Sequence, residues 1–165
     1  MKINKILRTD LIVIGITLVS LLFLIGYAQP LIISPNNELI SSNNSVLFSF
    51  DKASYLLIDE NPEFTSPEKI YVENNLAVNL KPGTYYWKIG GVLQSEVRKF
   101  TIESRIELKF RENLENNSYD VVNAGNTRLL VNVFDNTSII GYVVLDVDES
   151  TNISATKFLG RENEE

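Results

Sequence analysis

The hydrophobic pattern of this chain changes once, near residue 30. Residues 11–28 form an uncharged run that is mostly Leu, Ile and Val. Past Pro30 the apolar positions alternate with polar ones over short runs, which is the period of a β-strand with one buried face. The pattern predicts one long helix at the N-terminus and β-strands over the rest of the chain.

The uncharged run is long enough to cross a membrane. At ~1.5 Å per helical residue it spans ~27 Å, close to the ~30 Å hydrocarbon core of a bilayer. Lys2, Lys5 and Arg8 precede the run and are opposed only by Asp10. The positive-inside rule therefore predicts that the N-terminus lies in the cytoplasm.

Two other interpretations of the run stay open. A cleaved secretory signal is also apolar, and Gly26 and Ala28 are small residues at a spacing that signal peptidase accepts. The protein would then be secreted, although the run is longer than the usual ~7–15-residue signal core, which favours the anchor. A buried helix of a soluble domain is disfavoured, because no other segment has the length or period to pack around it.

Short β-prone runs follow Pro30, each bounded by Asn, Asp, Gly, Pro or Ser. They lie at residues 46–50, 55–58, 69–72, 77–80, 85–89 and 97–102. Strands joined by turns, with no amphipathic helix between them, favour an antiparallel β-sandwich over a parallel sheet. Further runs at 106–110, 129–134 and 139–145, with a turn signal at 123–126, predict a small second β module of four or five strands.

Several stretches of the first β segment resemble a known family. They are Ser34-Pro35, FSF at 48–50, ASYLLID at 53–59, NPEF at 61–64, LKPGTYYWKI at 80–89 and FTI at 100–102. Over about residues 31–103 they resemble a fibronectin type III domain of prokaryotic surface proteins. The resemblance implies a sandwich in which Leu80, Pro82 and Gly83 form the turn before a tyrosine corner. The family often has a tryptophan in its second strand, where this chain has Phe48 or Phe50.

The corner has two candidate tyrosines. The spacing typical of the family selects Tyr86, whereas strand alternation groups Tyr85, Trp87 and Ile89 on one face. We expect this second group to point inward, because the opposite choice would bury Lys88. A sugar-stacking platform of Tyr85 and Trp87 is the disfavoured alternative, since aromatic residues on a central strand usually belong to the core.

Composition and net charge limit the partners and the reactions that this protein can have. Residues 29–165 carry 20 acidic and 12 basic side chains, a net charge of −8, which disfavours nucleic acid as a partner. The chain has neither cysteine nor histidine, which removes disulfides, Ser-His-Asp and Cys-His catalysis, and histidine-ligated zinc. We expect no enzymatic activity and no cofactor.

Two acidic segments are candidate metal sites. Asp146, Asp148 and Glu149 offer hard oxygen ligands suited to calcium, but the segment lacks the glycine and the final glutamate of an EF-hand loop. A solvated turn is favoured there, and also at the acidic segment 59–61. We therefore expect no bound metal.

Four Asn-x-Ser/Thr acceptors fall in predicted turns. In a host that glycosylates this motif they are possible N-glycosylation sites, and the alternative is plain turn chemistry. They are Asn43, Asn116, Asn136 and Asn152.

The patterns divide the chain into five parts. They are a cytoplasmic N-terminus at 1–10, a transmembrane signal anchor at 11–28, a fibronectin type III-like β-sandwich at 29–103, a small β module at 104–159 and a flexible acidic tail at 160–165. This organisation predicts a single-pass protein of the cell membrane with extracytoplasmic β domains.

The favoured function is non-catalytic surface display, adhesion or envelope protein–protein interaction. Expected partners are the membrane, other surface or membrane proteins, and cell-envelope glycans. The alternative is an accessory single-pass subunit of a membrane or secretion complex. In that case the anchor would pack against partner helices, although Gly15 and Ser20 lack the four-residue spacing of a tight helix dimer.

Overall fold

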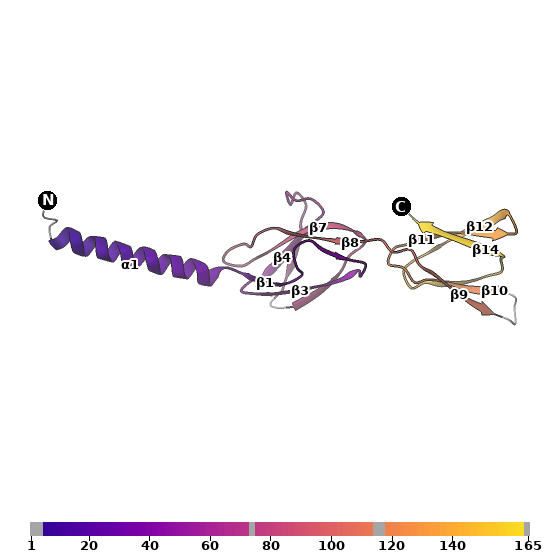
Figure 1. Cartoon of the computed structure of the whole chain (residues 1–165), viewed down its shortest axis with the longest axis horizontal. Coiled ribbons are helices and arrows are strands. Elements are labelled where there is room, and N and C mark those ends of the chain that lie inside the picture. The colour runs from indigo at the N-terminus through magenta and orange to yellow at the C-terminus, as the bar shows by residue number, and fades with distance from the viewer. Residues whose placement is uncertain (1–4, 73–74, 114–117, 164–165) are drawn as a thin grey trace. The chain divides into compact units, whose positions relative to one another are not determined.

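The computed structural model describes residues 5–72, 75–113 and 118–163. Within these ranges the chain begins with helix α1, Lys5–Ala28, and continues as strands (Figure 1). The strands before residue 103 are β1 Leu31–Ser34, β2 Leu39–Ser41, β3 Ser45–Asp51, β4 Tyr55–Asp59, β5 Glu68–Tyr71, β6 Asn75–Asn79, β7 Gly83–Gly90 and β8 Arg98–Ile102. The later strands are β9 Leu108–Asn113, β10 Ser118–Asn123, β11 Leu129–Asp135, β12 Ser138–Leu145, β13 Ser150–Ile153 and β14 Lys157–Glu162.

The predicted fold class is confirmed: the chain is all-β, with antiparallel sheets behind a single N-terminal apolar helix. The strand orders are β1-β3-β6, β2-β8-β7-β4-β5, β13-β10-β9 and β12-β11-β14. One pairing differs from the expectation, because β2 runs parallel to β8, from Leu39 opposite Phe100 to Ser41 opposite Ile102.

Helix α1 is apolar and unpacked. Among the described residues it is the one helix long and apolar enough to cross a membrane, over Leu7–Ala28, with a mean hydropathy of 2.6 and none of it buried. A membrane anchor and a signal sequence both fit these properties. The buried core helix, which the sequence already disfavoured, is excluded by this exposure.

By its internal contacts the chain divides into two compact units. The first comprises Met1–Pro35, Phe48–Leu76 and Tyr86–Arg98. The second comprises Asn36–Leu47, Ala77–Tyr85 and Lys99–Glu165.

The first unit has a core between two sheets. Phe48 of β3 meets Trp87 of β7 edge to face, with ring centroids 5.1 Å apart and an interplanar angle of 79°. In the register of β4 against β7, Leu56 pairs with Ile89 and Ile58 pairs with Trp87. All five side chains are buried, so these strands form a sandwich with its apolar faces together.

Strand alternation in β7 is confirmed. Trp87 and Ile89 are fully buried and Tyr85 is 6% exposed, so this group forms the inner face. Lys88, on the other face, is only partly exposed, and its ammonium lies 4.4 Å from the ring centroid of Phe64. The sugar-stacking alternative is excluded, because the faces of the Tyr85 and Trp87 rings are inside the protein.

Tyr85, in the second unit, makes the kind of hydrogen bond that the resemblance implies for a tyrosine corner. Its hydroxyl donates a 3.0 Å hydrogen bond to the backbone oxygen of Lys81, and its ring stacks on Phe100 at 5.5 Å. The family spacing selected Tyr86, which the alternation of the strand turns away from the core. The other residues predicted for this turn, Leu80, Pro82 and Gly83, are half-buried.

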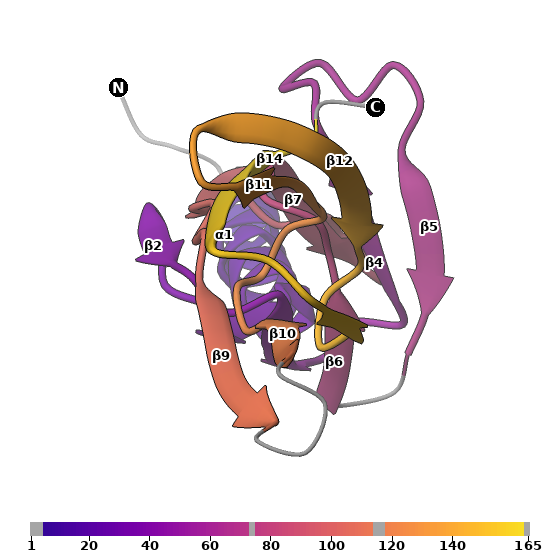
Figure 2. The same ribbon diagram turned by 90° about the vertical axis from the view of Figure 1, so that its right-hand side faces the viewer.

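The rest of the second unit is another small sandwich. β9, β10 and β13 make one layer, and β11, β12 and β14 make the other (Figures 1 and 2). Val121, Leu129, Val131 and Leu145 form its buried core. Six strands lie among the described residues of this region, where the sequence predicted four or five. The runs named from the sequence correspond to β9, β11 and β12, so β10, β13 and β14 were missed. STNI of β13 and KFLGRE of β14 alternate weakly in hydrophobicity.

The C-terminal segment 160–165 was predicted to be a flexible tail, but its first residues form part of a strand. Gly160, Arg161 and Glu162 belong to β14 and pair with β11, and Glu162 lies opposite Leu129. The backbone ladder holds this edge strand while the charged side chains of Arg161 and Glu162 remain exposed, an arrangement that edge strands accept.

Candidate functional site

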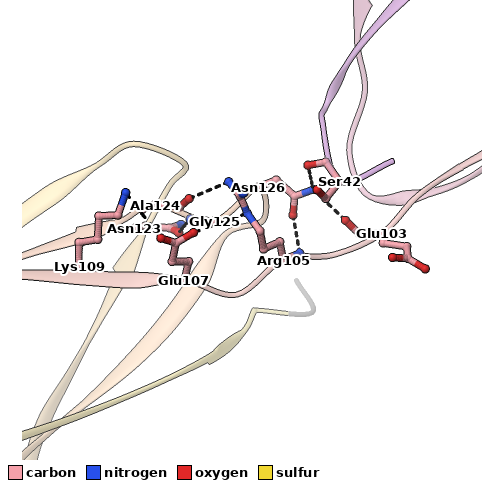
Figure 3. A network of polar contacts seen from close by, with 9 residues as sticks. All are labelled: Ser42, Glu103, Arg105, Glu107, Lys109, Asn123, Ala124, Gly125 and Asn126. Atoms are coloured by element: carbon pink, nitrogen blue, oxygen red, sulfur yellow. Dashed lines mark hydrogen bonds and ion pairs between the residues drawn. The ribbon is translucent and has the colours of Figure 1, made fainter. Parts of the chain in front are cut away.

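Asn126 joins three segments of the second unit, and its side chain is only 6% exposed. Its Oδ1 accepts a 2.6 Å hydrogen bond from the backbone N–H of Arg105, and its Nδ2 donates to the backbone oxygens of Ser42 and Glu103, both at 2.8 Å (Figure 3). The backbone oxygen of Asn126 accepts a 2.7 Å bond from Nδ2 of Asn44. The side-chain amide therefore ties the loop before β3 and the segment after β8 to the turn between β10 and β11.

A second asparagine shapes the turn that carries Asn126. Asn123 is fully buried, and its Nδ2 donates to the backbone oxygens of Thr127 at 2.8 Å and Leu145 at 3.1 Å. Its Oδ1 accepts a 3.0 Å bond from the N–H of Gly125. A Cβ atom on Gly125 would overlap the backbone oxygen of Arg105, so only glycine lets the turn approach this closely.

The charged side chains around this turn contribute less to its stability than the buried amides of Asn123 and Asn126 do. The guanidinium of Arg105 donates a 3.1 Å bond to the backbone oxygen of Ala124 and lies 3.7 Å from Glu107. Lys109 lies 3.6 Å from the same carboxylate. The three ionic side chains are between 39% and 69% exposed, and ion pairs in contact with solvent contribute ~0–1 kcal/mol. We call the contact of Asn126 with Ser42, Glu103 and Arg105 the junction. The buried amides, rather than the ion pairs, hold the junction together.

An open groove of about 760 Å³ lies beside the Asn126 network. Its lining includes Ser42, Asn43, Asn44, Asn79, Lys81 and Arg105. The Oδ1 atom of Asn44 is buried and has no hydrogen-bond partner in the described part of the chain. Amide and hydroxyl groups offer both donors and acceptors, which suits hydrogen bonding to sugar hydroxyls or to an extended peptide.

The acidic turn after β12 uses its carboxylates internally. Glu149 accepts a 2.8 Å bond from the N–H of Asp146, and Asp146 pairs with Arg128 at 3.1 Å. Asp148 adopts a positive φ of 61°, and its N–H donates to the backbone oxygen of Asn123 at 2.9 Å. Across residues 5–72, 75–113 and 118–163 no group of three acidic, histidine or cysteine side chains has an arrangement that could hold a metal.

The acidic turn after β4, in the first unit, is organised by Asp59. Its two carboxylate oxygens accept hydrogen bonds from the N–H of Asn61 at 3.0 Å and the N–H of Ser66 at 2.9 Å. These bonds stabilise the ionised form and hold the pKa of Asp59 below its ordinary value of 3.8. The Oδ1 of Asn61 in turn accepts a 2.9 Å bond from the N–H of Glu63.

The predicted glycan acceptors have different surroundings. Asn43 and Asn136 are exposed outside the strands, as expected. Asn152 was predicted in a turn, but it lies in β13, where it pairs with Asp120 and donates a 2.6 Å bond to that carboxylate. The fourth acceptor, Asn116, lies outside the described residues. Glycan occupancy stays a prediction.

The junction residues were not identified from the sequence. The turn signal at 123–126 was read correctly, but the partners of Asn126 lie between 21 and 84 positions away. Such pairings leave no local pattern in a chain.

Comparisons with known proteins assign no family. No family model matches the chain, and no curated protein matches it. The resemblance to fibronectin type III domains therefore stays a prediction.

Several solved structures are similar over most of the chain. The BSP domain of a biofilm-associated protein is 20% identical with a TM-score of 0.30, and the match covers 78% of this chain and 25% of that chain. Native α2-macroglobulin of Escherichia coli, domains NIE to MG1, is 10% identical with a TM-score of 0.29, covering 82% and 94%. A class 5 fimbriae chaperone is 15% identical with a TM-score of 0.20, covering 79% and 84%. Similarity at this level carries no function over from these proteins.

Proposed function

We propose that this protein is a non-catalytic, membrane-anchored surface protein that displays its β-sandwich units outside the cytoplasm. It would serve adhesion or interaction with other envelope proteins or glycans. The observation that carries the proposal is α1, whose large apolar side chains are exposed on every side; Phe23 is 76% exposed and Leu22 is 67% exposed. A helix that is apolar all round is stable when a membrane surrounds it.

Polar groups along α1 also suit a bilayer. The hydroxyl of Thr17 donates to the backbone oxygens of Val13 at 2.6 Å and Ile14 at 3.0 Å, so it needs no water. Arg8 lies near the N-terminal end and Tyr27 near the C-terminal end. Cations on the cytoplasmic flank and tyrosine at the interface are the arrangement that membrane helices favour.

The junction in the second unit supports a binding role for the β region. Asn126 fixes the segments that line the adjoining groove, and rigid supports make effective binding surfaces. Lys81 and Arg105 add cations to a lining that is otherwise rich in amides and hydroxyls. This groove is the surface we propose for contact with an envelope glycan or protein.

Thiol labelling tests the topology, because the chain has no cysteine of its own. On intact cells a membrane-impermeant maleimide is expected to label Ser138→Cys, and to label Asn4→Cys only after the cells are opened. The protein should stay with the membrane fraction after a carbonate wash. Labelling in the reverse order, or a soluble protein that begins at Gln29, would overturn the proposal.

Replacing residues 11–28 by an unrelated apolar anchor separates display from a role inside a membrane complex. A display protein keeps its surface exposure and its crosslinked partners after the exchange, because only the β units make the contacts. Loss of specific membrane partners would indicate that the anchor itself binds them, as in an accessory subunit.

A further inference from the structure

Several apolar side chains of the first unit are exposed. Val92 is 87% exposed, Leu31 is 59% exposed, Ile33 is 60% exposed and Val97 is 47% exposed. Single exposed apolar residues are ordinary, whereas a contiguous group of them marks a contact surface. We call residues 91–97, which connect β7 to β8, the proximal loop.

Direct contacts place the proximal loop beside the end of α1. The ammonium of Lys52 lies 4.4 Å from the ring centroid of Tyr27, in the last turn of the helix. The backbone oxygen of Lys52 would lie 3.1 Å from a Cβ atom on Gly91. Tyr27, Lys52 and Gly91 are therefore neighbours in space, and Val92 follows directly.

A small cavity provides an independent link. It is lined by Pro30 and Leu31, which follow α1, and by Ser95 and Arg98 from the other side. Figure 1 shows the connection between β7 and β8 on the side of this unit at which α1 ends.

The proximal loop is held in shape by its own hydrogen bonds. The N–H of Gly91 donates to the backbone oxygen of Leu93 at 2.9 Å, and the N–H of Ser95 donates to that of Ile89 at 2.8 Å. The Gln94 side chain donates a 3.2 Å bond to the Tyr55 hydroxyl. Val92 therefore lies in a turn that is fixed by hydrogen bonds, and its side chain is exposed.

Charge around the loop favours an apolar contact over an electrostatic one. Glu96 is paired with Arg98, whose Nη2 and Nε atoms lie 3.0 and 3.1 Å from one carboxylate oxygen. Asp51 and Lys52 carry opposite charges beside each other. These four charges balance, so together they give the proximal loop no excess of cations with which to attract anionic lipid.

We propose that the proximal loop rests on the membrane that α1 spans, with the Val92 side chain inserted at the interface. This inference rests on the proposed membrane anchoring. The 22 residues of Leu7–Ala28 span ~33 Å as a helix, against ~30 Å of hydrocarbon, so Tyr27 reaches the interface. Val92, close to Tyr27 through Lys52, lies at the same depth. Leu31, which lines the same cavity as Ser95 and Arg98, continues the apolar contact.

Depth-dependent fluorescence quenching tests the inference on the full-length protein. Single cysteines at Val92, Ile16, Tyr27 and Glu63 are each labelled with an environment-sensitive dye, and the proteins are reconstituted in phosphatidylcholine vesicles with and without a nitroxide-labelled lipid. Glu63 lies beyond the opposite end of β4 from Lys52 and is exposed. The emission of Trp87, the only tryptophan and fully buried, reports before labelling that each variant is folded.

The expected result is that the Val92 dye shifts to the blue and loses emission to the lipid quencher as the Tyr27 dye does, while the Glu63 dye does neither. Equal quenching is expected when phosphatidylglycerol is added, because the contact is apolar. If the Ile16 dye is quenched but the Val92 dye behaves like the Glu63 dye, the membrane anchor stands and the contact of the proximal loop is overturned. An Ile16 dye that escapes quenching would overturn the membrane anchor itself.

Discussion

The side-chain oxygen of Asn126 accepts a 2.6 Å hydrogen bond from the backbone amide of Arg105, while the backbone amide of Asn126 donates at 3.1 Å to the oxygen of Arg105. The two residues thus exchange hydrogen bonds in both directions, as paired residues in an antiparallel ladder do. In this way the turn at 123–126 holds the extended segment around Arg105, which belongs to no sheet.

Replacement of Asn126 by alanine is expected to weaken the second unit. The substitution removes three side-chain hydrogen bonds, each worth about 1 kcal/mol, so we expect a loss of about 2–3 kcal/mol in the free energy of unfolding. Urea unfolding of the full chain in detergent measures the loss. Hydrogen exchange should speed up at the amide of Arg105.

Asn152→Ala is the matched control for that substitution. Asn152 is exposed and makes its side-chain bond to an exposed carboxylate, so its removal should cost less than about 0.5 kcal/mol. Equal losses for the two variants would show that Asn126 is not the centre of the junction.

A methyl group at position 125 is expected to disturb the same contact. In Gly125→Ala the new Cβ overlaps the backbone oxygen of Arg105, and backbone cannot rotate away as a flexible side chain can. Overpacking of this kind costs about 1–3 kcal/mol. Gly141→Ala provides the comparison, because nothing lies within 4 Å of its added Cβ. Thermal unfolding should show a lower midpoint for Gly125→Ala only, and equal midpoints would contradict the close approach of the turn to Arg105.

Local patterns predicted most of the fold. The alternation in residues 85–89 gave the correct inner face of β7, because burying Lys88 would be costly. The uncharged run predicted α1, which begins before the run at Lys5 and ends with it at Ala28, two residues before Pro30. Strands such as β14, which alternate weakly and are held by pairing with β11, escaped detection.

The junction was predictable only in part. Asn123 and Gly125 are turn formers, and the turn at 123–126 was recognised from them. The role of Asn126 depends on Ser42 and Glu103, which are brought to it by the fold. A sequence shows that an asparagine can form hydrogen bonds, but its partners follow from tertiary structure.

Tyr85→Phe is expected to remove the corner hydrogen bond. The substitution leaves the ring in place against Phe100 but deletes the hydroxyl that donates to Lys81. Loss of one such bond costs about 0.5–1.5 kcal/mol. If the family spacing were right, Tyr86→Phe would be the damaging change. We expect instead that Tyr86→Phe leaves the free energy of unfolding nearly unchanged. Urea unfolding of both variants decides between them, and a larger loss for Tyr86→Phe would assign the corner to the other tyrosine.

Asp59 should make the stability of the first unit depend on pH. The N–H groups of Asn61 and Ser66 lower the pKa of Asp59 in the folded protein, so its stabilising contribution is complete above the unfolded value of 3.8. The contribution is lost as the pH falls through the folded pKa, because protonation removes the charge that both N–H groups stabilise. Asp59→Asn should therefore be less stable than the wild type at pH 7, and the difference should shrink below pH 3.8. Glu60→Gln, which keeps the backbone N–H of residue 60, serves as the control. Urea unfolding at pH 7 and pH 3 measures the difference for both variants, and a gap between wild type and Asp59→Asn that stays constant with pH would mean that the carboxylate does not organise this turn.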